Sequence, residues 1–202
     1  MKITVERDEL LRALNHIQGL VEKRNTVPIL SNILLDVNDN KLRIFATDMI
    51  IEVVQSLNCD VLNTGKTTIS AHTLYDIIRK LSTGSQVEIM QAGTKDPIEI
   101  KSGKSNFKLP SISPEEFPTM DNAKMPFNFL IKSNDLCLLL DRTKFAMSAE
   151  ETRHYLNGIY LHKINVNNKS FLSAVATDSH RLSSSRLEID SSINFESIIL
   201  PR

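Results

Sequence analysis

Apolar residues recur at helical spacing in three segments of the chain, each preceded by a short strand-like stretch and followed by strand-like runs. Most apolar positions in a segment lie three or four residues apart, which places them on one helix face. The three stripes are Leu10, Leu14, Ile17 and Val21, then Leu74, Ile77, Ile78 and Leu81, then Leu136, Leu139 and Leu140. The pattern predicts three amphipathic helices. Ser70 and Ser133 stand where the second and third would begin, and we expect both to be N-caps.

Strand-like runs follow each predicted helix. They cover residues 29–37, 41–46 and 50–57 after the first, 86–90, 98–101 and 106–109 after the second, and 158–163, 170–176 and 181–189 after the third. Asn38-Asp39-Asn40 is a hairpin turn signal, and Gly103 marks another turn. The chain is thus predicted to consist of repeated units, each with one helix among strands.

The first and third units also match each other in sequence. Leu30–Leu35 aligns with Leu156–Leu161, and Ala46-Thr47-Asp48 aligns with Ala176-Thr177-Asp178. The third unit has four more residues between the two matches. We assign the additional residues to a longer hairpin through 164–169, because hairpin tips tolerate insertions best. The alternative is a chance likeness between two strand-rich stretches.

Segment 111–126 contains three prolines and two glutamates, which indicates an extended connection between domains. We therefore place a first domain of two units at residues 1–125 and a second domain at 126–202. Because the chain stops directly after a strand, the repeat predicts a fourth unit that is missing. We expect the second domain to be truncated here or completed by a partner, since an open sheet edge is poorly stable alone.

Charge and cysteine content narrow the possible functions. Lys and Arg number 24, as do Asp and Glu, which argues against a tight, static grip on nucleic acid without excluding contact with it. Cys59 and Cys137 lie far apart and outside any CxxC pair, so we expect neither a disulfide framework nor a zinc site. The sequence shows no signal peptide and no apolar run long enough to span a membrane, so we expect an intracellular protein.

The segment AVATDSHRL combines an acid, a histidine and an arginine. Asp178 and His180 would share one side of a strand and could serve a small enzyme. However, the sequence has no nucleophile elbow, phosphate-binding glycine loop or HExxH motif. The first unit repeats Thr-Asp without the histidine and arginine, so we interpret this pair as a turn device whose aspartate accepts backbone N–H groups. His180, Arg181 and Leu182 then predict a binding surface.

Two loops at matching places in the first and third units carry basic or aromatic side chains. They are Glu22–Asn25 and Arg153–Asn157. Contacts to a DNA backbone or base are one interpretation, and ordinary loop packing or a solvated turn is the other. A general protein-interaction domain without a DNA role therefore remains a third hypothesis, beside the DNA-linked protein and the small enzyme.

Several segments together resemble the bacterial DNA polymerase III β subunit, the family of replicative sliding clamps. They are MKITVER, TVPILSNILL, ATDMIIE, SGKSNFKLPSISPEEFP, RHYLNGIYL, ATDSHRLS and ILPR, in the family's order along the chain. The resemblance implies an α+β fold, the DNA-clamp fold, in which duplicated βαβββ units place helices on one face of antiparallel sheets. It also implies a cytoplasmic, non-catalytic processivity factor with no cofactor, no metal and no membrane association.

The resemblance further implies a head-to-tail homodimeric ring around double-stranded DNA. The implied protein partners are the DNA polymerase III catalytic subunit, the clamp loader, and other clamp-binding polymerases and repair proteins. The chain departs from the family in length, because it covers the first domain and part of the second while the third is absent. We therefore expect that the 202-residue chain by itself cannot close a ring.

Residue roles follow from the resemblance position by position. It implies DNA contacts at Arg24, Glu150, His154 and Tyr155, a partner-peptide groove at Leu156, Thr177, Ser179, His180, Arg181 and Leu182, and a subunit interface at Lys104, Asn106, Phe107 and Leu109. Three of these residues depart from the family pattern. Ser179 stands where glycine is common, His154 where tyrosine is often found, and Glu150 where a neutral polar residue is known.

Overall fold

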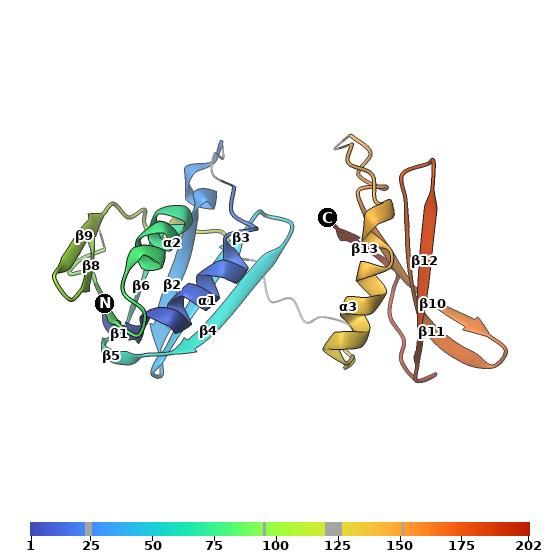
Figure 1. Ribbon diagram of the computed structural model, residues 1–202, viewed down its shortest axis with the longest axis horizontal. Helices are drawn as coiled ribbons and strands as arrows, with labels where there is room; N and C mark the ends of the chain where they lie inside the picture. The colour runs from blue at the N-terminus through green and yellow to red at the C-terminus, as the bar shows by residue number, and fades with distance from the viewer. Residues whose placement is uncertain (23–25, 95, 120–126, 151) are drawn as a thin grey trace. The chain divides into compact units, whose positions relative to one another are not determined.

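The computed structural model describes residues 1–22, 26–94, 96–119, 127–150 and 152–202. The chain divides into two compact units, Met1–Asp121 and Asn122–Arg202 (Figure 1). Each unit is described by itself below. The strand pairs in both are antiparallel, and helices cover one face of the sheets, so the predicted α+β class is confirmed.

The described residues of unit 1 form two sheets and two α-helices. The first sheet has the strand order β5-β1-β7-β8-β9 and the second the order β4-β3-β2-β6. The elements are β1 (Lys2–Glu6), α1 (Arg7–Ile17), the 3-10 helix η1 (Pro28–Ser31), β2 (Asn32–Asn38), β3 (Lys41–Thr47), β4 (Glu52–Asn58), β5 (Asp60–Asn63), β6 (Gly65–Ser70), α2 (Ala71–Lys80), β7 (Gln86–Met90), β8 (Ile98–Ser102), β9 (Ser105–Leu109) and η2 (Pro114–Glu116).

The core of unit 1 lies where α1 and α2 pack against one face of both sheets. On α1, the predicted residues Leu10, Leu14 and Ile17 are buried, so the stripe is confirmed for these three. The fourth, Val21, is buried too, but it lies beyond the end of the helix at Ile17. On α2, Leu74 and Ile78 are fully buried, whereas Ile77 is only partly buried at the edge of the core. Leu81, predicted as the last residue of the stripe, directly follows the helix and is also partly buried. The α2 stripe is therefore wider than the core that it covers.

The described residues of unit 2 place one α-helix over one sheet of order β12-β11-β10-β13. Leu139 on the helix packs with Ile159, Leu172 and Ala174, which lie on the sheet face beneath it. The elements are α3 (Ser133–Asp141), η3 (Lys144–Ala146), β10 (Gly158–Val166), β11 (Lys169–Thr177), β12 (Leu182–Ile189) and β13 (Ile198–Pro201). The sheet is the counterpart of β4-β3-β2-β6 in unit 1, as the internal repeat predicts.

The hairpin prediction for residues 164–169 is confirmed. β10 and β11 remain paired up to Val166 and Lys169, and the turn between them is Asn167-Asn168. Both turn residues have positive φ, 50° and 61°, as Asp39 and Asn40 do in the β2–β3 hairpin. Two-residue turns with positive φ match the twist of paired strands, so both copies turn in the same way.

Two local predictions are corrected by the structure, and a third is confirmed. Residues 28–31 form a 3-10 helix that starts with Pro28, and the strand begins only at Asn32, because proline presets the φ of a helical turn. Ser133 is the first residue of α3 and not its cap, and Lys132 occupies the N-cap position. Ser70, in contrast, is the predicted N-cap of α2, since its side chain accepts from the Thr73 N–H.

Candidate functional site

The end of the β11–β12 hairpin is shaped by two side chains that bind its own backbone. Thr177 Oγ1 donates to the Arg181 carbonyl at 2.7 Å and accepts from the Ser179 N–H at 3.1 Å. Asp178 Oδ1 accepts from the N–H groups of His180 and Arg181, both at 3.0 Å. These bonds hold Ser179 at a φ of 75°. The sequence Thr-Asp therefore fixes a tight turn that projects the three following side chains outward.

The β3–β4 hairpin of unit 1 uses the same hydrogen bonds. Thr47 Oγ1 donates to the Ile51 carbonyl at 2.8 Å and accepts from the Met49 N–H at 3.0 Å. Asp48 Oδ1 accepts from the N–H groups of Ile50 and Ile51. Met49 has a φ of 76°, the equivalent of Ser179. The interpretation of Thr-Asp as a repeated turn device is confirmed.

Asp178 is engaged by these bonds and unsuited to general-base work. The backbone N–H groups of Arg181 and His180 are the main causes that lower the pKa of its carboxyl group. Its second oxygen accepts from Arg181 Nε at 2.9 Å. Only the backbone of His180 is bonded to this carboxylate. The geometry therefore gives no support to an acid–base pair of Asp178 and His180.

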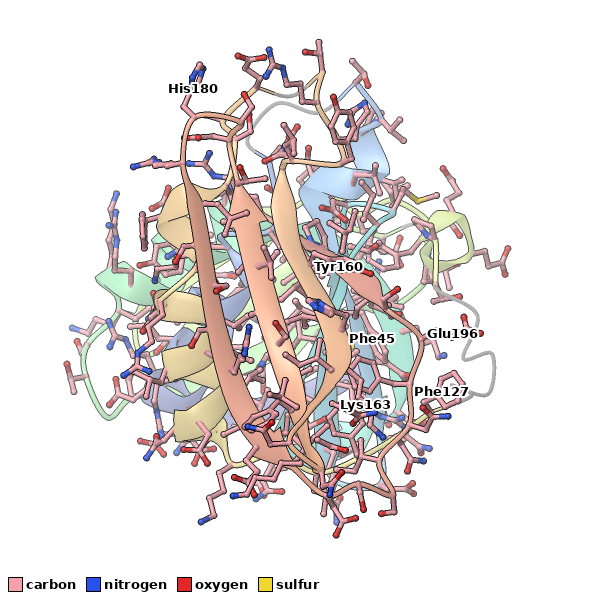
Figure 2. The ribbon with its side chains drawn as sticks, turned by 90° about the vertical axis from the view of Figure 1, so that its right-hand side faces the viewer. Phe45, Phe127, Tyr160, Lys163, His180 and Glu196 are labelled. Atoms are coloured by element: carbon pink, nitrogen blue, oxygen red, sulfur yellow. The ribbon has the colours of Figure 1, made fainter. Side chains whose placement is uncertain are left out.

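An exposed surface of polar and apolar side chains is formed by His180, Arg181 and Leu182. Leu182 is 67% exposed, and His180 lies at the end of the hairpin (Figure 2). The Arg181 guanidinium carbon lies 5.6 Å from the centroid of the Phe145 ring, which is 57% exposed. Arg181 is thus held between a carboxylate and an aromatic ring while its edge stays accessible. Phe145 was not among the predicted site residues, although an aromatic residue beside a basic helix end is a signal for it.

The loop before β10 lies at the same end of the sheet. Arg153 Nη1 donates to Ser179 Oγ at 3.2 Å, which joins the loop to the hairpin turn. Leu156 is anchored through its backbone, since its N–H donates to the Arg153 carbonyl and its carbonyl accepts from the Ser148 N–H. The structure therefore brings Leu156 to the sheet end that carries Thr177 and the residues that follow it.

The candidate DNA-contact residues of unit 2 occupy this loop. Arg153 Nε is paired with the Glu150 carboxylate at 2.8 Å, so the acid is neutralised by its neighbour. Tyr155 is 71% exposed, and His154 is exposed too. The loop presents two rings and a balanced ion pair to solvent. Arg24, the candidate in unit 1, lies outside the described residues.

The candidate subunit-interface residues are on and beside β9, an edge strand that pairs only with β8 among the described strands. Phe107 and Leu109 are partly buried against the core of unit 1. Lys104 lies in the turn that follows Gly103, and Asn106 faces solvent. Ile77 of α2 lines a shallow cavity with Phe107.

One residue of α2 and the residue that directly follows the helix therefore extend this edge beyond the predicted set. Ile77 and Leu81 line the cavity together with Phe107 and keep part of their apolar surface accessible. The sequence signal was present, because the apolar stripe continues past the end of the ten-residue helix to Leu81 and exceeds what one core contact needs.

The part of the chain that the structure describes contains no cluster of three or more His, Cys, Asp or Glu residues able to hold a metal ion. Within the same ranges, no helix is long and apolar enough to cross a membrane. Cys59 is buried and Cys137 is exposed, and both are free thiols. Burial is the main cause that raises the pKa of the Cys59 thiol.

Comparison with protein families gives two matches that together span most of the chain. Residues 1–121 match the family described as DNA polymerase III beta subunit, N-terminal domain. Residues 130–202 match DNA polymerase III beta subunit, central domain.

Individual relatives agree with the family matches. The chain is 41% identical over 203 residues to the beta sliding clamp of Caulobacter vibrioides. The match covers 100% of this chain and 55% of the relative. It is 36% identical to that of Rickettsia felis, of which it covers 52%. The chain thus spans about half the length of the relatives that it matches.

Solved structures match the whole chain as well. A Caulobacter crescentus beta sliding clamp superimposes with a TM-score of 0.95 at 40% identity, over 100% of this chain and 54% of that one. A sliding clamp from Bartonella birtlesii bound to griselimycin matches with a TM-score of 0.94 at 38% identity, over 100% and 54%.

Proposed function

Because the chain belongs to the DNA polymerase III beta subunit family, we propose that it acts in a processivity factor of the replicative polymerase. In this role a sliding clamp encircles duplex DNA and tethers the polymerase and other replication and repair proteins. The observation that carries the proposal is the match of both units, in order and over the whole chain, to a beta sliding clamp with a TM-score of 0.95. The expected place of action is the cytoplasm.

The proposed role is non-catalytic, with nucleotidyl transfer left to the partner polymerase. Two observations support it. Asp178, the acid of the only enzyme-like segment, is committed to its own turn. The net charge of zero also suits a protein that moves along DNA, because strong phosphate binding would oppose sliding.

For the DNA-contacting surface we propose Arg24 together with the loop of Glu150, His154 and Tyr155. Exposed rings can stack on bases or pack on the sugar-phosphate backbone. The two charges of the Arg153–Glu150 pair neutralise each other, so the contacts of this loop with DNA gain little from phosphate attraction and are weak. Such contacts orient the duplex without holding it in place.

For the partner-binding surface we propose Leu156, Thr177 and the run Ser179–Leu182, to which we add Phe145. The exposed Leu182 and Phe145 offer apolar anchor sites. Arg181 lies against the Phe145 ring and can donate to backbone carbonyls of a bound peptide. The ligand of the Bartonella birtlesii clamp, griselimycin, supports a small-molecule or peptide site in the family.

For the contact between subunits we propose β9 with the neighbouring face of α2. The edge strand offers unpaired backbone groups, and Phe107, Leu109, Ile77 and Leu81 offer apolar area. Lys104 and Asn106 supply the polar rim. A head-to-tail homodimer would place this edge against a different surface of the second subunit.

A hybrid protein tests the proposed function. The 202 residues replace the matching 54% of the Caulobacter crescentus clamp, and the hybrid is loaded onto nicked circular DNA by the clamp loader. We expect retention on the circle and release after the DNA is cut to a linear form, since the link is topological. An assembled hybrid dimer that leaves circular and linear DNA at the same rate contradicts the proposal.

Binding of the polymerase III catalytic subunit tests the partner surface on the 202-residue chain itself. Leu182→Asp is expected to lower affinity about tenfold or more, because it puts a charge at an apolar anchor. Val166→Asp, a change at another exposed apolar residue (39% against 67% for Leu182) at the far end of the same sheet, is the control and is expected to leave affinity unchanged. Equal effects from the two variants would remove Leu182 from the surface.

A further inference from the structure

Arg153 belongs to neither of the two surfaces proposed for unit 2, but its side chain contacts both. Its Nε is paired with the Glu150 carboxylate at 2.8 Å, in the loop proposed to meet DNA. Its Nη1 donates to Ser179 Oγ at 3.2 Å, in the turn of the proposed partner-binding surface. One guanidinium therefore joins two segments that lie 26 residues apart in the chain.

The backbone on both sides of this bridge is held by hydrogen bonds. In the loop, the Arg153 N–H donates to the Glu150 carbonyl at 3.1 Å, and the Arg153 carbonyl accepts from the Leu156 N–H at 2.8 Å. In the turn, the Ser179 N–H donates to Thr177 Oγ1 at 3.1 Å. Because these bonds fix the loop and the turn, a change of partner at the bridge is made by the Arg153 side chain.

The two bonds to Arg153 differ in strength. The Glu150 carboxylate carries a full charge, whereas Ser179 Oγ is a neutral acceptor, and hydrogen bonds between ionised partners are shorter and stronger. The distances agree, at 2.8 Å for the carboxylate and 3.2 Å for the hydroxyl. Phosphate oxygens are charged acceptors as well, and arginine binds both carboxylate and phosphate. A DNA phosphate that reaches Arg153 therefore displaces the serine before the glutamate.

Ser179 makes its contact from a strained backbone. Its φ of 75° lies in the left-handed region, which glycine enters freely and other residues enter at a cost. Strained residues of this kind cluster at ligand-binding and switch regions of proteins. The serine therefore costs stability at the turn, and its hydroxyl makes the bond to Arg153 that a glycine cannot make.

We propose that Arg153 transmits DNA contact from the loop to the partner-binding turn. A phosphate that meets the loop binds the Arg153 guanidinium and displaces Ser179 Oγ, which frees the serine hydroxyl within the partner-binding surface. Without DNA, Glu150 and Ser179 occupy the same guanidinium and hold the affinity for DNA down. The inference rests on the proposed function, because it needs the loop of Glu150, His154 and Tyr155 to face DNA.

Binding of a fluorescently labelled DNA duplex to the 202-residue chain at low salt measures this competition. Ser179→Ala removes one competing acceptor and is expected to raise DNA affinity about twofold. Glu150→Gln frees the full charge of Arg153, so we expect a gain of about threefold to tenfold and a salt dependence steeper by about one counterion. Ser179→Asn keeps an acceptor at positive φ and is expected to restore the original affinity.

Two comparisons assign these effects to Arg153. In an Arg153→Ala background, Ser179→Ala and Glu150→Gln are expected to lose most of their effect, because the cation for which they compete is gone. Glu188→Gln is the matched control, since it frees Lys169 from an exposed ion pair of 2.9 Å on the same sheet. We expect it to change DNA affinity less than about twofold. Equal gains from Glu150→Gln and Glu188→Gln would reveal a general effect of net charge and overturn the proposal.

Nuclear magnetic resonance of the isotopically labelled chain, titrated with the same duplex, separates the transmission from DNA binding itself. In the unmodified chain we expect DNA-dependent shifts at Tyr155 in the loop and at Ser179 in the turn. In Arg153→Ala the shift at Tyr155 remains and the shift at Ser179 is lost. Shifts at Tyr155 without any at Ser179 in the unmodified chain would overturn the transmission alone. No DNA-dependent shift in the loop would remove the proposed DNA-contacting surface and the transmission with it.

Discussion

Arg7 on α1 donates from Nε to the carbonyl oxygen of Ile78 on α2 at 2.9 Å, although its side chain is almost fully buried. Its Nη2 donates to the Arg79 carbonyl at 2.7 Å, and its Nη1 is paired with Asp8. The last carbonyls of a helix have no partner inside the helix and carry partial negative charge. A buried guanidinium from the neighbouring helix therefore caps α2 and fixes the two helices to each other.

Arg7→Ala is expected to lower the free energy of unfolding of unit 1 by about 2–3 kcal/mol, because buried carbonyls lose a charged donor. Arg12→Ala is the control. Arg12 lies exposed on the same helix with one long bond to the Asp8 carbonyl, and its loss is expected to cost less than about 0.5 kcal/mol. Urea unfolding followed by circular dichroism measures both, and equal losses would deny the capping role of Arg7.

Ser179→Gly is expected to stabilise unit 2 by about 1 kcal/mol, since glycine adopts a φ of 75° without the steric cost of a side chain. Ser184→Gly, an exposed change in the regular strand β12, is expected to destabilise by about 0.5–1 kcal/mol for the opposite reason. Thermal unfolding of the two variants gives the comparison. A loss of stability in Ser179→Gly would show that the serine side chain adds more stability than its positive φ costs.

Gly158→Ala is expected to open the edge of the sheet in unit 2. A Cβ at this position would lie 2.6 Å from both Ile199 Cγ2 and the Leu200 carbonyl oxygen, so β13 would have to move. Such overpacking costs about 1–3 kcal/mol. Amide hydrogen exchange at Leu200 should accelerate, whereas Gly19→Ala, which meets no atom within 4 Å, should leave exchange unchanged.

The pKa of the Asp178 carboxyl group is expected to be lower than in an unfolded chain, because backbone N–H groups of Arg181 and His180 stabilise its ionised form. A folded-state pKa below the unfolded value means that the stabilisation is complete above the unfolded pKa. It is lost as the pH falls through the folded value. Carbon-detected titration of Asp178 measures the folded pKa directly.

Asp178→Asn is the companion variant for this prediction. It removes the ionisable group, so the acid-side loss of stability should become shallower than in the unmodified chain. An unshifted Asp178 titration, or an unchanged acid-side slope in the variant, contradicts the account of the turn.

Local pattern was sufficient to predict the helices, the hairpins and the repeated Thr-Asp turn, because each depends on residues close in sequence. The predicted start of β2 was wrong because Pro28 favours a short helical turn before the strand. The predicted N-cap of α3 was wrong because the first N–H groups of that helix are accepted by the Lys132 carbonyl and not by a side chain.

The parts of the site that sequence alone missed depend on contacts between distant residues. Phe145 reaches Arg181 only because η3 packs under β11, and Ile77 meets Phe107 only because α2 lies beside the edge of the first sheet. The packing of Ile112 and Phe117 on Leu34 in unit 1 likewise joins segments far apart in the chain. Residue type suggests such positions, but tertiary packing assigns them.

The turns after β3 and β11 share one backbone conformation but display different side chains. In each, threonine and aspartate alone supply the side-chain bonds that set the backbone path, so the following residues are free to diverge after a duplication. One copy has Met49 and Ile50 where the other has Ser179 and His180. A fold built from copies can in this way acquire a new recognition surface in one repeat without redesigning its architecture.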